Sequence, residues 1–64
     1  MFQGKYRGHH ITVDTLEREA GWTATYRIDQ GEVRRYGARP LPSEEIVLEE
    51  AIAEAKWMID RMAE

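Results

Sequence analysis

The chain has 64 residues, a formal net charge of −3 and no cysteine. This length allows a single domain (residues 1–64) with a marginal core, and the absence of cysteine excludes disulfide scaffolds and thiol chemistry. No apolar run approaches the roughly 20 residues of a membrane span, and the N-terminus lacks a signal-peptide core, so we expect a cytoplasmic protein without membrane contact.

The charges are divided unevenly along the chain. Residues 1–42 contain seven Lys or Arg and five Asp or Glu, whereas residues 43–64 contain two and seven. An acidic total argues against general affinity for nucleic acid, although a local basic face is compatible with it.

The first predicted strand runs from Tyr6 to about Leu16, where β-branched residues favour extended backbone. Alternation places Ile11 and Val13 on one face. The opposite face then carries His10, Thr12 and Asp14. The polar segment 17–21 ends in glycine and is predicted to be a loop.

The second predicted strand has the clearest alternation, with one apolar face and one polar face. The apolar positions are Trp22, Ala24, Tyr26 and Ile28, and the polar ones are Thr23, Thr25, Arg27 and Asp29. A turn at 29–31 leads to a third strand over about 32–38, in which Arg34 and Tyr36 share one face. Segment 40–42 contains two prolines and is expected to end the sheet.

From Ser43 to about Met62 the chain is rich in Ala, Glu and Leu, which favour a helix, and Ser43 is a suitable N-cap. An apolar stripe with helical spacing is expected to pack on the apolar sheet face. The stripe consists of Leu48, Ala51, Ile52, Ala55, Met58, Ile59 and Met62, with Val47 at its edge. The sequence therefore predicts an α+β fold: a three-stranded antiparallel meander followed by one long C-terminal helix on one face.

A second, thinner apolar row lies nearly opposite this stripe. At 100° per residue, Ile46, Ala53 and Trp57 fall close together, with Glu50 in the same row. Two interpretations explain it: the Trp57 ring folds over its own neighbours or under the N-terminal residues, or the row is a partner interface. We expect an interface with a protein partner, and favour a homodimer because small domains commonly pair with two-fold symmetry.

Catalysis is not expected, and neither is a cofactor. His9 and His10 are adjacent in a strand and point to opposite faces, so they do not share a metal ion. Ser43, the one serine, is explained as a helix cap, and the five glycines form no phosphate-binding loop.

A nucleic-acid-binding face is the alternative function. If the registers agree, Arg27, Arg34 and Tyr36 lie together on the open side of the sheet. Basic and aromatic side chains on a small sheet are typical of single-stranded nucleic-acid platforms, which combine stacking with phosphate contacts.

The order of elements, together with the helix opening Pro42–Glu45 and the Glu/Ala-rich segment Leu48–Ala55, resembles the HicB-like small antitoxin domains. The chain is also similar to short uncharacterised bacterial proteins. The resemblance implies the topology and a tendency to dimerise, and it carries over no site residues.

Overall fold

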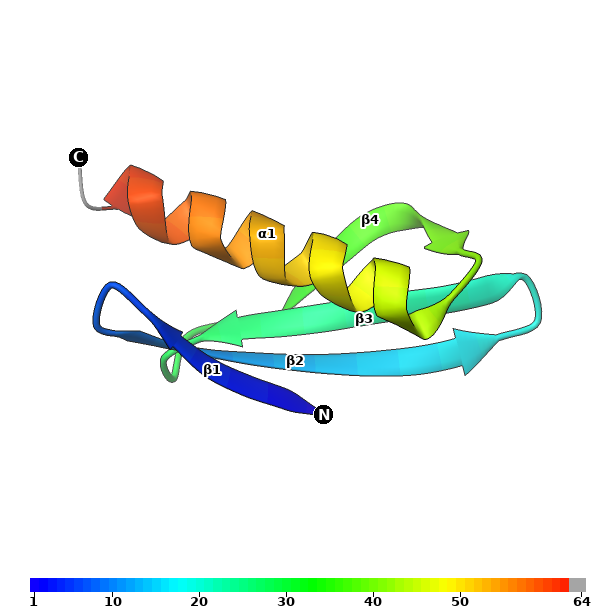
Figure 1. Cartoon of the computed structure of the whole chain (residues 1–64), viewed down its shortest axis with the longest axis horizontal. Coiled ribbons are helices and arrows are strands. Elements are labelled where there is room, and N and C mark those ends of the chain that lie inside the picture. The colour runs from blue at the N-terminus through cyan, green and yellow to red at the C-terminus, as the bar shows by residue number, and fades with distance from the viewer. Residues whose placement is uncertain (63–64) are drawn as a thin grey trace.

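A four-stranded antiparallel sheet lies under one long helix in the computed structural model, which describes residues 1–62 except the side chain of Ala38 (Figure 1). The elements are β1 (Phe2–Tyr6), β2 (His9–Arg18), β3 (Gly21–Ile28), β4 (Arg34–Leu41) and α1 (Glu44–Met62). The strands are adjacent in chain order, as in a meander. The predicted α+β class, antiparallel sheet and C-terminal helix are confirmed, whereas the predicted number of three strands is wrong.

The additional strand is β1, which pairs with β2 from Phe2 opposite Val13 to Tyr6 opposite His9. Between them Arg7 and Gly8 have φ values of 50° and 83°. Two successive residues with positive φ form the kind of tight hairpin turn whose twist matches that of its strands. The first predicted strand therefore ran through a turn, because its start at Tyr6 lies in β1 and its remainder lies in β2.

The β2–β3 hairpin is tighter than the sequence indicated. Arg18 pairs with Gly21, which leaves Glu19 and Ala20 as the loop. Gly21 has a φ of 139°, and a Cβ at this position would lie 2.6 Å from the carbonyl oxygen of Leu41. The close approach of β4 thus requires glycine here. Because β1 pairs only with residues 9–13, segment 14–18 of β2 has no strand on its other side within the described residues.

Strand β4 pairs with β3 in two parts separated by a bulge. Ala24 lies opposite Tyr36 and Trp22 opposite Leu41, so segment 37–40 forms the bulge, which is visible in Figure 1 as the arch of β4 towards α1. Gly37 in this bulge has a φ of 67°. The sheet was predicted to end at Pro40, but β4 continues to Leu41, since an edge strand tolerates a residue without an N–H group.

The core lies between α1 and one face of the sheet. The helix contributes Val47, Ala51, Ala55 and Ile59, which are spaced by four residues and fully buried. The sheet contributes Ile11, Val13, Ala24 and Tyr26, and partly buried residues such as Trp22, Ile28, Leu48 and Ile52 surround them. The predicted packing of the helix on the apolar sheet face is confirmed, but Val47 lies in the core rather than at the edge of the stripe, and Met62 is 58% exposed. At its start, the Oγ of Ser43 accepts a hydrogen bond of 3.2 Å from the backbone N–H of Ile46, as expected for an N-cap.

Candidate interaction surfaces

Tyrosine hydroxyls on the sheet donate hydrogen bonds to carboxylates on α1. Tyr26 donates to Oε2 of Glu54 at 2.7 Å, and Tyr36 donates to Oε1 of Glu50 at 2.8 Å. Burial, followed by the hydrogen bond to Glu54, raises the pKa of Tyr26 to about 12, and the hydrogen bond to Glu50 raises the pKa of Tyr36. Both phenols are therefore protonated near neutral pH and act as structural donors rather than as acids or nucleophiles.

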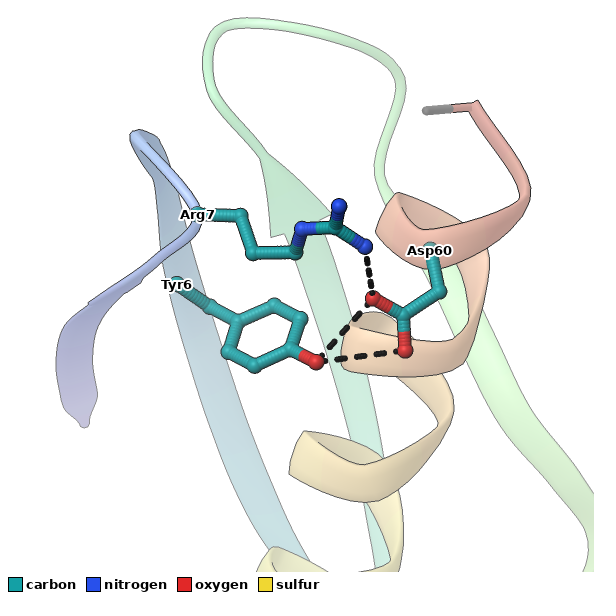
Figure 2. A network of polar contacts seen from close by, with 3 residues as sticks. All are labelled: Tyr6, Arg7 and Asp60. Carbon is teal, nitrogen blue, oxygen red and sulfur yellow. Dashed lines mark hydrogen bonds and ion pairs between the residues drawn. The ribbon is translucent and has the colours of Figure 1, made fainter. Parts of the chain in front are cut away.

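A third tyrosine joins β1 to the end of α1. Tyr6 donates to both carboxylate oxygens of Asp60, at 3.0 and 3.2 Å, and Nη1 of Arg7 donates to Oδ1 at 2.9 Å (Figure 2). The hydrogen bond from Arg7 is the main cause that lowers the pKa of Asp60. The Arg7–Asp60 pair is about half exposed, so its contribution to stability is small.

The two histidines differ in orientation and partners. The register places His9 opposite Tyr6 and His10 opposite Lys5, and hence on opposite faces of β2. Asp29 binds both residues, because its Oδ2 lies 2.7 Å from Nδ1 of His9 and its Oδ1 accepts the backbone N–H of His10 at 3.0 Å. The backbone hydrogen bond from His10 and then the side chain of His9 lower the pKa of Asp29. Within residues 1–62 no group of three His, Asp or Glu side chains is placed to hold a metal ion.

On the side of α1 opposite the core, the predicted second row is exposed. Trp57 is 55% exposed and Ile46 44% exposed, and Ala53 between them is also exposed. The guanidinium carbon of Arg61 lies 4.7 Å from the centroid of the Trp57 ring. The fourth member of the predicted interface, Glu50, lies at the flank of the row, where it accepts the hydroxyl of Tyr36.

The residues predicted for a nucleic-acid face do not lie together. Tyr26 pairs with Arg34 and Ala24 with Tyr36, and residues paired across strands share a face. Arg34 and Tyr36 therefore lie on the helix side of the sheet, whereas Arg27 lies on the outer side. The predicted grouping of these three residues on the open face is wrong, because the register of β4 was assigned one residue out of phase with β3.

The outer face instead combines Arg27 with other cations that the sequence interpretation missed. The register places Lys5 beside His10, Arg27 beside Thr12, and Arg35 beside Thr25. Arg18 lies further along β2, and it borders a shallow hollow together with Thr23, Arg35, Gly37 and Pro40. The period-two pattern of residues 2–6, with Gln3 and Lys5 as the polar positions, was the signal that places Lys5 on this face.

No described helix is long and apolar enough to cross a membrane. No protein-family model, curated protein or solved structure matches the chain. The function is therefore inferred from two surfaces: the exposed row on α1 and the outer face of the sheet.

Proposed function

We propose that the protein is a small, non-catalytic interaction module of the cytoplasm that forms a homodimer through α1. The observation that carries this proposal is the exposed row of Ile46, Ala53 and Trp57 on the side of α1 that faces away from the core. A helix that covers one sheet needs a single apolar side, and a second one is typical of a contact surface. The row is short, so we expect a weak dimer with a dissociation constant in the micromolar range.

The charges on α1 favour an antiparallel arrangement of the two helices. The first half of α1 contains four glutamates and no base, whereas the second half has two bases, Lys56 and Arg61, and two acids, and is neutral. A parallel pair would bring the glutamates of both copies together, which is repulsive. An antiparallel pair with Ala53 at the two-fold axis brings Glu49 of one copy near Lys56 of the other. The small side chain of Ala53 allows close approach of the two helices.

Sedimentation equilibrium over a wide concentration range tests the dimer. At every concentration, the Trp57→Ser variant is expected to contain more monomer than the wild-type protein, because the substitution removes the largest apolar side chain of the row. The matched control is Val33→Ser, since Val33 is 57% exposed and lies outside α1. A wild-type protein that remains monomeric at millimolar concentration, or a Trp57→Ser variant that dimerises like wild type, contradicts the proposal.

A charge exchange tests the orientation. Glu49→Lys is expected to weaken the dimer by placing two lysines together, and the double variant Glu49→Lys/Lys56→Glu is expected to restore it. Failure of the double variant to recover, with Trp57→Ser still dissociating the dimer, would refute the antiparallel orientation and leave the dimer itself standing.

The resemblance to HicB-like antitoxin domains implies a tendency to dimerise, which supports this proposal. It assigns no residues to a site. The alternative function through Arg27, Arg34 and Tyr36 is not kept in that form, because the register separates Arg27 from the other two.

A further inference from the structure

The outer face of the sheet has a marked excess of positive charge in a protein that is acidic overall. Among the residues that the structure describes, its strand positions include four exposed basic residues and a single carboxylate, Asp14. The basic residues are Lys5, Arg18, Arg27 and Arg35. None of them forms an ion pair within the part of the chain that the structure describes. The acidic side chains that offset this charge lie mainly on α1, on the other side of the sheet.

Lys5, Arg27 and Arg35 lie in successive outward rows of the sheet, and Arg18 lies two rows beyond Arg35. Thr12 pairs with Arg27, and in the next outward row Asp14 pairs with Thr25 and Thr25 with Arg35. Successive outward rows of a sheet are two residues, or about 6.8 Å, apart. This spacing is about two base-pair steps of B-DNA, in which each strand carries one phosphate per about 3.4 Å of axis. Threonine hydroxyls between the cations supply further hydrogen-bond donors for phosphate oxygens.

The chemistry of the face favours a double helix over a single strand. The outer positions of the four strands carry no Phe, Tyr or Trp side chain within the described residues, and His10 is their one ring, since the register places Tyr6, Tyr26 and Tyr36 on the helix side. Binding of single strands depends on such aromatic groups for base stacking. Contacts from Arg, Lys and Thr side chains to a regular row of phosphates need no stacking.

We propose that the outer face of the sheet binds the phosphate backbone of double-stranded DNA, with Lys5, Arg18, Arg27 and Arg35 as the phosphate contacts. B-DNA is preferred to duplex RNA because its wide major groove accepts side chains from a β-sheet, and threonine methyl groups contact thymine methyls there. Asp14 lies among the cations and repels phosphate. It is suited to accept a hydrogen bond from a cytosine amino group instead.

This site does not depend on the proposed dimer. Pairing through the far side of α1 leaves the two outer sheet faces pointing in opposite directions, so each copy binds its own duplex. A Trp57→Ser variant that is monomeric is therefore expected to keep the affinity of the outer face for DNA.

Fluorescence anisotropy with a labelled DNA duplex, measured from low to physiological salt, tests the proposal. Four phosphate contacts predict a slope of log K against log salt of about −3.6. Arg35→Gln and Arg27→Gln are each expected to reduce the slope by about 0.9 and to weaken binding at low salt several-fold. Arg34→Gln is the matched control, because it removes the same charge from the neighbouring residue on the other face. Asp14→Asn is expected to tighten binding to a duplex of A·T pairs, because it removes the charge that repels phosphate, and to tighten binding to a duplex rich in G·C pairs less, because it weakens the contact with cytosine.

Several outcomes would overturn this assignment, provided that thermal unfolding shows each variant to be folded. Absence of binding at low salt is one, and an Arg34→Gln variant weakened as much as Arg35→Gln is another, because binding would then follow net charge alone. If the protein binds the single strand or duplex RNA of the same length more tightly than the DNA duplex, the proposal that the outer face binds double-stranded DNA is contradicted. Equal binding to polyglutamate at the same charge concentration indicates an acidic protein partner in place of DNA.

Discussion

Removal of the Tyr26 hydroxyl should weaken the attachment of α1 to the sheet. Tyr26 is 3% exposed, and its hydroxyl donates to the Glu54 carboxylate at 2.7 Å. A hydrogen bond to a charged group contributes about 1.5–3 kcal/mol, and we expect the lower end here because Glu54 is only partly buried. Tyr26→Phe should therefore lower the free energy of unfolding by about 1.5 kcal/mol.

Burial of Tyr26, together with this bond, makes the stability depend on pH in the alkaline range. The folded protein raises the pKa of Tyr26 to about 12, whereas the unfolded chain keeps the ordinary value near 10. The stabilisation is therefore complete below pH 10 and is lost as the pH rises towards 12. Two pKa units correspond to about 2.7 kcal/mol, which we reduce to about 1.5 kcal/mol because the Glu54 partner is only partly buried.

Urea unfolding at a fixed low protein concentration, followed by circular dichroism, measures both effects. The difference in unfolding free energy between wild type and Tyr26→Phe should shrink between pH 10 and pH 12. Tyr36→Phe is the control, because its hydrogen bond to Glu50 is exposed and its loss should cost less than about 0.5 kcal/mol. Equal costs for the two variants, or a difference that does not change with pH, would refute the argument that burial strengthens the Tyr26 bond.

Four further variants test the core, a glycine and an acid-sensitive contact. Ile59→Ala should cost about 3 kcal/mol because Ile59 is fully buried, whereas Ile46→Ala should cost less than about 0.5 kcal/mol in the monomer; urea unfolding that shows similar costs would contradict the assigned helix faces. Gly21→Ala should lower the melting temperature, because its Cβ would lie 2.6 Å from the Leu41 carbonyl oxygen and its φ is 139°, and an unchanged melting temperature would disprove this contact. The lowered pKa of Asp29 stabilises the fold above its unfolded value of 3.8, and this stabilisation is lost as the pH falls below that value; Asp29→Asn should therefore flatten the acid limb of the stability profile, and an unchanged acid limb would contradict the proposed contacts.

The sequence predicts the elements that have strong local signals. Strand β3 has uninterrupted alternation, so its buried positions Ala24 and Tyr26 are evident from the pattern alone. The helix has an N-cap at Ser43 and a long run of helix-forming residues, and its start was predicted within one residue. The exposure of Ile46 and Trp57 follows from the helical period.

Strand pairing was harder to predict because it depends on non-local geometry. The Arg7–Gly8 turn has no residue pair that strongly favours positive φ at both positions, so β1 was not separated from β2. The side of the sheet on which Tyr36 lies depends on the number of residues between Asp29 and the first residue of β4 that pairs with β3. A shift of one residue moves every side chain of β4 to the other face, and composition does not fix this count. Of the candidate DNA-binding residues, Arg27 was predicted and Arg35 was missed for the same reason, whereas Lys5 and Arg18 were missed because β1 was not separated from β2 and residues 17–21 were predicted to be a loop.

The incomplete cover of β2 by β1 has a consequence for solubility. Peptide groups of segment 14–18 are open on the side of β1, and an open strand edge is a template for aggregation. Asp14, Glu17 and Arg18 place charges on both faces along this edge, and a foreign strand that added there would have to bring its own side chains close to them. Replacing these three residues with apolar ones should turn the hairpin end into a nucleus for fibrils.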